Sequence, residues 1–426
     1  MKKSYMAAVC AFAASAAVSG CSGEPQLSSA EYGTAEAKVC VAASNSETEL
    51  LGGARFVQAI ESGVEELGGR ATDVTVDNDA QTLISSGCTV IVGTDPSQLS
   101  QAARANENIS FVLVGSSFLD EEGAKTELDN GLAVDFRMDE ASYLAGYAAA
   151  GMTTTGKIGV VGGENTPLTW ATMDAFTQGV DAYNLANGTS IIVSGWDSVS
   201  QKGSISSTPE AAKEQAQVMI ADGVDIILAA AGDANTGVSE AAAESDQPMM
   251  RVITTQASIG DTTSAPADSG QSADSTQSGQ EAQSGQEPQS GRASTGDKTE
   301  SAQSALQSGN TTQSLSSSQA KTMLAHPYEF SDEYLKSVGA NVLTGVVTDF
   351  ETVIADVLAA AVDGKTGQTT QPYDLASGTV ALAGFGAYDP LISDDLRNAL
   401  AQQYTQIVGG QVTVTTAFDV TDRDED

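Results

Sequence analysis

The sequence predicts an α/β fold with two doubly wound parallel-sheet lobes, and three observations lead to this prediction. Short apolar runs alternate with helical patterns, which is typical of parallel sheets with helices on both faces. About 340 residues carry this pattern, which is more than a single hydrophobic core usually holds. The alternation also resumes after a long polar segment, so the last part of the chain is expected to complete both lobes.

The first 256 residues contain the larger share of the predicted elements. Buried strands are predicted at residues 39–43, 90–92, 111–114, 158–161, 191–193 and 226–230. Helices are predicted at residues 47–67, 140–150, 169–185 and 209–222. In the first of these helices, apolar residues recur every three or four positions, the stripe of a helix that packs on a sheet. We assign residues 38–136 to a first lobe and residues 137–256 to a second.

The returning segment, residues 322–418, carries the remaining elements. Strands are predicted at residues 341–347 and 380–384, and helices at residues 349–362 and 393–404. Residues 407–414 form a last alternation of apolar and polar positions. The acidic tail, residues 419–426, is expected to fray. Two lobes that meet at a hinge would enclose a small solute in the cleft between them.

Residues 257–321 interrupt the pattern. They consist mainly of Ser, Gln, Gly, Thr and Ala, repeat the triplet Gln-Ser-Gly and contain no aromatic residue. Such a segment buries too little apolar surface to offset the entropy of ordering its chain, so it is predicted to be disordered. A tolerated surface-loop insertion is the favoured interpretation, and a cell-wall spacer or a glycosylated segment is an alternative.

The N-terminus is typical of an exported lipoprotein. Lys2 and Lys3 precede an apolar run at residues 7–18, which is too short to span a bilayer but fits the core of a signal peptide. Residues 18–21, Val-Ser-Gly-Cys, resemble a bacterial lipobox, which implies removal of residues 1–20 and lipidation of Cys21. Residues 21–37 would then be a flexible tether. A plain cleaved signal with a chance cysteine is the alternative.

The charge and the cysteines restrict the function further. A formal net charge of -37 repels phosphate backbones and anionic lipid heads, which argues against nucleic-acid binding and leaves the lipid as the membrane attachment. Cys40 and Cys88 each lie at the start of an apolar, strand-like run, residues 39–42 and 88–92, and the first and third strands are neighbours in a doubly wound sheet. A disulfide between them suits an oxidising compartment. Two buried, reduced thiols are the alternative.

The sequence offers little support for catalysis. His326 is the only histidine, and a lone histidine does not make a metal site. The chain has neither a P-loop nor a Gly-x-Ser-x-Gly nucleophile elbow. We therefore predict a binding protein that is not an enzyme and that uses no cofactor and no metal.

Several motifs, in order along the chain, carry a resemblance to a known family. They are FRMDEASYLAG at residues 136–146, IGVVGG at 158–163, GWD at 195–197, ADGVDII at 221–227, AAG at 230–232 and NVLT at 341–344. Together they resemble the basic membrane lipoprotein (Bmp) family, the purine nucleoside receptor type of substrate-binding protein. The resemblance covers most of residues 39–414 outside the insertion. It implies a type I periplasmic-binding-protein fold with hinge crossovers, and a monomer that delivers nucleosides to an ABC permease.

The resemblance also suggests ligand contacts. Trp196 lies where the family places an aromatic residue, which would stack on a base; a hinge or core position is the alternative. Gly232, Asp233 and Asn235 follow a predicted strand, and ligands of open α/β sheets bind at such ends. Helix capping is the alternative for the last two residues.

Four further residues are candidates because family signatures are altered here. The first loop lacks the family's Asp-x-Ser-Phe-Asn signature, and residues 251–256 read RVITTQ in place of G-V-D-x-D-Q. The neutral or acidic side chains that would substitute for the missing contacts are Asn45, Glu47, Ser116 and Thr254. Arg137 and Glu140 open a helix at the expected crossover and either shape the hinge or form an ordinary ion pair at a helix start.

These observations predict the substrate-binding lipoprotein of an ABC importer, anchored on the extracytoplasmic face of the cell membrane. It would capture a nucleoside-like polar solute in an interlobe cleft. The alternative is a sensory or non-transport surface lipoprotein whose cleft is modified or degenerate.

Overall fold

The computed structural model describes residues 37–42, 54–163, 166–247, 250–258, 262–264, 328–330, 335, 341–367 and 373–415. These residues all belong to one compact unit, Glu36–Asp426. The predicted signal peptide, Cys21, the tether, Asn45, Glu47, most of the insertion and the acidic tail lie outside the described residues.

The first sheet contains five parallel strands in the order β2-β1-β3-β4-β5. Their bounds are β1 Ala37–Ala42, β2 Ala71–Asp77, β3 Val90–Gly93, β4 Ser110–Val114 and β5 Gly131–Val134. The helices between them are α2 Ala54–Glu66, α3 Ala80–Ser85 and α4 Pro96–Ala105, with a 3₁₀ turn, η1, at Gly68–Arg70. Strands β1 and β3 are neighbours, as the sequence predicted, and Cys40 pairs with Ile91 across them.

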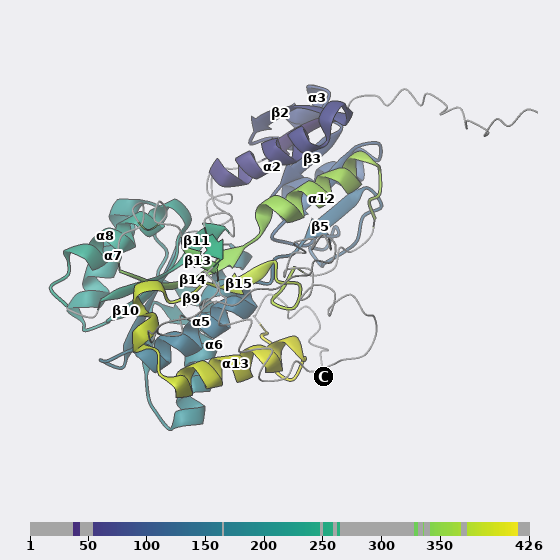
Figure 1. Ribbon diagram of the computed structural model, residues 1–426. Helices are drawn as coiled ribbons and strands as arrows, with labels where there is room; N and C mark the ends of the chain where they lie inside the picture. The colour runs from purple at the N-terminus through teal and green to yellow at the C-terminus, as the bar shows by residue number, and fades with distance from the viewer. Residues whose placement is uncertain are drawn as a thin grey trace, which may run out of the picture. The chain divides into compact units, whose positions relative to one another are not determined.

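Alternate residues of the first sheet pack on opposite faces. Val39 and Val41 of β1 join a core with α2, whereas Cys40 and Ala42 join a core with α3 and α4. Helix α12, Phe350–Val362, lies beside α2 on the first of these faces (Figure 1). The returning segment therefore completes the first lobe.

The second sheet has six strands in the order β15-β14-β11-β10-β6-β7. Their bounds are β6 Lys157–Gly162, β7 Ile192–Ser194, β10 Ile226–Ala230, β11 Arg251–Ser258, β14 Val342–Thr348 and β15 Val380–Leu382. All neighbours are parallel except β14 and β15. Without β15, the order repeats the 2-1-3-4-5 pattern of the first sheet, which is a doubly wound topology.

The second sheet is also covered on both faces. Helices α5 Met138–Met152, α6 Pro167–Asn187 and α13 Asp394–Val408 lie on one side and share a core with Ile158 and Leu228. Helices α7 Pro209–Ala221 and α8 Asn235–Glu244 lie on the other and share a core with Val161 and Ile227. A two-stranded hairpin, β8 Trp196–Asp197 with β9 Lys202–Gly203, follows β7.

Helix starts follow local signals in the sequence. Helices α6 and α7 begin with proline directly after Thr166 and Thr208, whose side chains accept hydrogen bonds from Thr169 and Ala211 amides. Proline is well suited to the first helical position, because the N–H group that it lacks would have no partner within the helix there. The preceding threonine side chain accepts a hydrogen bond from another unpaired N–H group of the first turn. The predicted start of the second of these helices, at Pro209, is therefore confirmed.

Three crossovers connect the two sheets in the described part of the chain: residues 135–137, residue 349 and residues 373–379. The first and third are hydrogen-bonded, since the Arg137 amide donates to the Tyr373 carbonyl at 2.8 Å and the Tyr373 amide to the Asp135 carbonyl at 3.1 Å. The Asp349 amide likewise donates to the Thr379 carbonyl at 2.8 Å. The crossovers thus form one bundle of adjacent, hydrogen-bonded segments.

Some details differ from the sequence predictions. Strand β11 extends to Ser258, past the predicted start of the insertion at residue 257, and β12, Thr262–Ser264, pairs with β13, Tyr328–Phe330. Backbone pairing there supplies the order that the polar side chains do not predict. The run predicted at residues 191–193 forms an edge strand that is half exposed, not buried. Residues 407 and 408 end α13, and residues 411–415 form no regular element.

Candidate functional site

A cavity of about 240 Å³ lies where the two sheets meet the crossovers. We call it the crossover cavity. Its walls come from the segments after β4 and β5 and from the first turns of α4, α5 and α6. Its lining residues include Ser116, Ser117, Lys125, Asp135, Arg137, Asp139 and Pro167. Because β4 and β5 are parallel, their carboxyl ends open at the same edge of the sheet, where ligands of such sheets bind.

Ser116 reaches this cavity because of the turn that follows β4. Gly115 has a φ of 78°, in the left-handed region that glycine enters without strain. The Gly115 amide donates to the Val134 carbonyl at 2.7 Å, which holds the turn beside the end of β5. Of the predicted ligand residues in the described part of the chain, Ser116 alone lines the crossover cavity.

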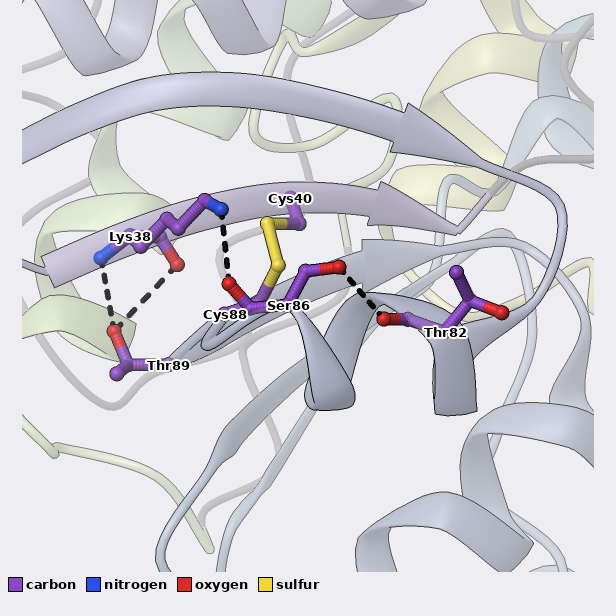
Figure 2. Close-up of a disulfide and its surroundings, with 6 residues drawn as sticks. All are labelled: Lys38, Cys40, Thr82, Ser86, Cys88 and Thr89. Carbon is purple, nitrogen blue, oxygen red and sulfur yellow. Dashed lines mark hydrogen bonds between the residues drawn. A yellow bond between two sulfur atoms is a disulfide. The ribbon is translucent and has the colours of Figure 1, made fainter.

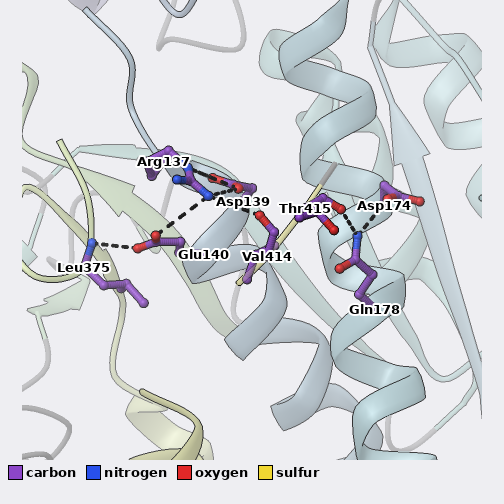
Figure 3. A network of polar contacts seen from close by, with 8 residues as sticks. All are labelled: Arg137, Asp139, Glu140, Asp174, Gln178, Leu375, Val414 and Thr415. Atoms are coloured by element: carbon purple, nitrogen blue, oxygen red, sulfur yellow. Dashed lines mark hydrogen bonds and ion pairs between the residues drawn. The ribbon is translucent and has the colours of Figure 1, made fainter. Parts of the chain in front are cut away.

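Arg137 is a charged group at the cavity wall that makes several hydrogen bonds. Its Nε donates to both carboxylate oxygens of Asp139, at 3.0 and 3.2 Å, and one terminal nitrogen donates to Asp139 at 2.8 Å (Figure 3). That nitrogen also donates to the Val414 carbonyl at 3.2 Å. Asp139 is 7% exposed, so this pair is held in a largely desolvated place where fork-shaped contacts are strong.

Glu140 occupies the next position in the first turn of α5. Its carboxylate lies 3.8 Å from Arg137 and accepts a hydrogen bond from the Leu375 amide at 3.2 Å. Burial raises the pKa of Glu140 to about 7, although Arg137 and the Leu375 amide lower it. The neighbouring carboxylates of Asp139 and Asp374 raise this pKa further. Glu140 thus joins the first crossover to the third.

Trp196 lies in the core and is not among the residues that line the crossover cavity. It is 6% exposed, and its indole nitrogen donates to Asp174 at 2.7 Å. Asp174 in turn accepts from Gln178, which also donates to the Thr415 carbonyl at 2.7 Å (Figure 3). This placement matches the core alternative for Trp196, and a stacking contact with a ligand stays a prediction.

The other predicted contacts follow strands of the second sheet. Gly232 begins a short 3₁₀ turn after β10 with a φ of 57°, and Asp233 beside it is exposed. Asn235 is 1% exposed and accepts from the Ala231 amide at 2.7 Å, while Thr254 on β11 is 1% exposed. Asn235 therefore fixes the turn after β10, and the ligand role of these four residues stays a prediction.

Cys40 and Cys88 are joined by a disulfide whose Cα atoms are 6.0 Å apart (Figure 2). The bond ties β1 to the residue that precedes β3 by two positions. Lys38 reinforces the junction, since its ammonium donates to the Ser86 carbonyl at 3.1 Å and its amide to the Thr89 hydroxyl at 3.0 Å. Both sulfurs lie in the core under α3 and α4.

Sequence reasoning missed several residues of the crossover cavity. Ser117, Lys125, Asp135 and Asp139 line it, and none was a candidate. Asp135 and Asp139 flank Arg137, so the charges clustered at the expected crossover were an available signal.

No helix in the described part of the chain is long and apolar enough to cross a membrane. Nor do the described residues contain a group of three or more His, Cys, Asp or Glu side chains that could hold a metal ion.

Comparison with known proteins identifies the family. The family model described as "ABC transporter substrate-binding protein PnrA-like" (Bmp) matches residues 47–264, just over half of the chain. The chain belongs to this family. The family resemblance predicted from the motifs is therefore confirmed.

Curated relatives of this Bmp-family protein match over a shorter stretch. Basic membrane protein D of Borreliella burgdorferi is 37% identical over 145 residues, 33% of this chain and 38% of that protein. The ABC transporter nucleoside-binding protein BmpA of Lactococcus lactis is 33% identical over 145 residues, 34% of this chain and 37% of that protein. The matches thus span well under half of the length of these relatives.

Solved structures confirm the fold of the Bmp-family chain. An ABC transporter solute-binding protein from Aeropyrum pernix matches with a TM-score of 0.58 at 15% identity, covering 88% of this chain and 92% of that one. A solute-binding protein from Conexibacter woesei matches with a TM-score of 0.50 at 15% identity, covering 89% and 99%. Together with the two parallel sheets, these matches confirm the type I periplasmic-binding-protein fold.

Proposed function

We propose that this protein is the substrate-binding lipoprotein of an ABC importer and that it captures a nucleoside-like polar solute in the crossover cavity. The observation that carries the proposal is the cavity's construction. Ser116 follows a strand of the first sheet, whereas Asp139 and Pro167 belong to helices that cover the second. A solute between these walls would contact both lobes, so that binding would favour their closure.

The chemistry of the walls suits a hydroxyl-rich solute. Ser116 and Ser117 offer hydroxyl groups, Arg137 offers donors, and the carboxylates of Asp135 and Asp139 offer acceptors. A sugar hydroxyl both donates and accepts, so it matches this mixture better than a purely apolar or singly charged solute does. The volume, about 240 Å³, lies just below the ~300–1,000 Å³ typical of ligand sites, which favours a small solute.

A nucleoside is the class of solute that the relatives support. The Lactococcus lactis relative is named as a nucleoside-binding protein, and the chain shares 33% identity with it over 145 residues. The lipobox-like residues 18–21 support a lipid anchor at Cys21, on the extracytoplasmic face of the membrane. In this proposal the protein acts as a monomer, delivers the solute to an ABC permease and catalyses no reaction.

Isothermal titration calorimetry tests the solute class. The protein is titrated with adenosine, guanosine, inosine, uridine and cytidine, and with ribose, glucose and glutamine as other polar solutes. We expect at least one nucleoside to bind. We expect Ser116→Ala to weaken that binding by about tenfold, because a lost hydrogen bond in a closed site costs about 1.4 kcal/mol.

Ser85→Ala is the matched control. Ser85 is exposed on α3 and its hydroxyl donates only to the Gln81 carbonyl of its own helix at 2.8 Å, so its removal should leave the affinity unchanged. Binding of glucose or glutamine with no response to any nucleoside would replace the proposed solute. Binding of nothing would favour a non-transport lipoprotein. Detergent partitioning of wild type and Cys21→Ala tests the anchor separately, since only the wild type should enter the detergent phase.

A further inference from the structure

The crossover bundle is held by one acidic side chain as well as by its backbone. Glu140 sits in the first turn of α5, directly after the first crossover, and its carboxylate accepts from the Leu375 amide of the third crossover at 3.2 Å. The side chain of Glu140 is 13% exposed. The Leu375 carbonyl accepts from the Tyr404 hydroxyl of α13 at 2.9 Å, so this residue is anchored on both sides.

The same carboxylate is connected to the crossover cavity through Arg137. Arg137 lines the cavity, pairs with Asp139 and lies 3.8 Å from Glu140 (Figure 3). When Glu140 is ionised, Arg137, Asp139 and Glu140 carry a combined charge of about -1, and when Glu140 is protonated they are neutral as a group. A change of protonation at Glu140 therefore alters both the bond between the crossovers and the field at the cavity wall.

We propose that Glu140 is a proton-linked positioning residue of the hinge, whose protonation is coupled to solute binding in the crossover cavity. The inference deepens the proposed function and rests on it. Neither the family resemblance nor the comparisons assign this role. The residue acts through Arg137 and the Leu375 amide and does not itself line the cavity.

The electrostatic surroundings support this role. Burial raises the pKa of Glu140 to about 7, so the group changes charge near neutral pH. The charged groups that act on it are Arg137 and Asp139 from its own helix start and Asp374 from the third crossover. Helix α13 contributes the Tyr404 hydroxyl, which donates to the Leu375 carbonyl.

The direction of the coupling follows from desolvation. A solute in the crossover cavity excludes water from Arg137 and Asp139, and closure of the lobes would exclude it from Glu140. Removing water disfavours the charged form of a carboxyl group, so the bound state should hold the proton of Glu140 more tightly. Binding near pH 7 should then take up a proton, and affinity should fall as the pH rises from 6 to 8.

The test is calorimetry of the nucleoside that binds best, performed at pH 6, 7 and 8 in phosphate and in Tris. These buffers differ in ionisation enthalpy, so the difference in heat at one pH counts the protons taken up. We expect uptake by the wild type and about threefold weaker binding at pH 8 than at pH 6. Glu140→Gln keeps an oxygen acceptor for the Leu375 amide but cannot titrate, and should bind with no Glu140-linked proton uptake and a flat pH profile.

Asp181→Asn is the matched control, because burial also raises the pKa of Asp181 on α6, and the carboxylate that acts on this group is Asp174 rather than Glu140. It should retain the wild-type pH profile. The inference would be overturned if the affinity of Glu140→Gln kept the wild-type dependence on pH, or if Asp181→Asn lost that dependence to the same extent as Glu140→Gln.

A solute-free measurement separates the failure of this inference from failure of the proposed function. Small-angle scattering of wild type and Glu140→Gln at pH 6 and pH 8 reports the separation of the lobes. A pH-dependent change in the wild type that Glu140→Gln lacks would support the hinge role even if no nucleoside binds. Identical, pH-independent profiles would refute it, whatever solute the cavity takes.

Discussion

Single residues decide which candidate contacts reach the crossover cavity. Ser116 was predicted from a difference between this chain and the family signatures, and the turn at Gly115 brings it to the cavity wall. Asp135 and Asp139 were not predicted as cavity residues, because their shared position depends on how the chain passes from β5 of the first sheet into α5. A motif specifies which residues are neighbours along the chain, whereas a cavity wall joins residues from separate elements.

Glu140 also makes a prediction for stability at this scale. Its pKa, raised to about 7 by burial, means that the folded state binds the proton more tightly than the unfolded state, whose value is near 4.5. The stabilisation from that proton is present at pH 4.5 and is lost as the pH rises through 7. Urea unfolding should therefore show that, as the pH rises from 5 to 8, the free energy of unfolding of the wild type falls by up to about 3 kcal/mol relative to that of Glu140→Gln.

The comparison variant for this measurement is Asp246→Asn, whose side chain is exposed after α8. Its stability should follow that of the wild type across the pH range. A constant difference between wild type and Glu140→Gln would show that the carboxyl group titrates in the same way in both states.

At the scale of elements, α5 and α6 pack unusually closely because of two glycines. A Cβ at Gly146 of α5 would lie 2.0 Å from the Phe176 carbonyl oxygen, and a Cβ at Gly179 of α6 would lie 2.0 Å from the Tyr143 carbonyl oxygen. Both obstacles are backbone atoms, which cannot move aside as a flexible side chain can. The two glycines thus set the distance between the helices that begin beside the crossover cavity.

Gly179→Ala should therefore force the helices apart. We expect a loss of about 3 kcal/mol or more in the free energy of unfolding, because overpacking displaces backbone as well as side chains. Gly69→Ala is a suitable control, since a Cβ at Gly69 meets nothing within 4 Å. Equal midpoints of urea unfolding for wild type and Gly179→Ala would contradict the close packing.

The disulfide between Cys40 and Cys88 acts at the same scale, since it connects the start of the first sheet to its third strand in chain order. The bond closes a loop with a sequence separation of 48. Restricting a loop of this length in the unfolded chain stabilises the fold by about 4 kcal/mol. A Cys40→Ala, Cys88→Ala double variant should lose about that amount, measured under oxidising conditions. Wild-type protein treated with reductant before unfolding should lose stability too. If neither the double substitution nor reduction lowered the free energy of unfolding, the stabilisation by the disulfide would be contradicted.

The elements that the sequence predicted well are those with strong local signals. Ile226–Ala230 forms β10 with the predicted bounds, because five consecutive apolar residues suit a central strand that is buried on both faces. Strand β2 was missed because it is an edge strand, where Val76 is 50% exposed and polar residues alternate with apolar ones. Strand β5 was missed because Gly131–Val134 is too short to stand out.

At the scale of the whole molecule, the two-lobe prediction depended on length and on the repeated alternation, and both sheets have the predicted doubly wound order. Because the strands of each sheet are parallel apart from β15, their carboxyl ends meet at one edge, and the crossover cavity lies at that edge of the first sheet. The sequence located one of the cavity's residues through family differences. The rest required knowledge of which loops meet, and that is set by the packing of α5, α6 and α12.

The position of α12 has a consequence for how the molecule is made. This helix, together with α2, covers one face of the first sheet, and the Ser110 hydroxyl of β4 donates to the Ala361 carbonyl across 251 positions of sequence. During synthesis the first sheet's strands would emerge long before the helix that shields them. Until residue 362 has left the ribosome, part of that apolar face would be exposed, so nascent chains cut short before α12 should aggregate.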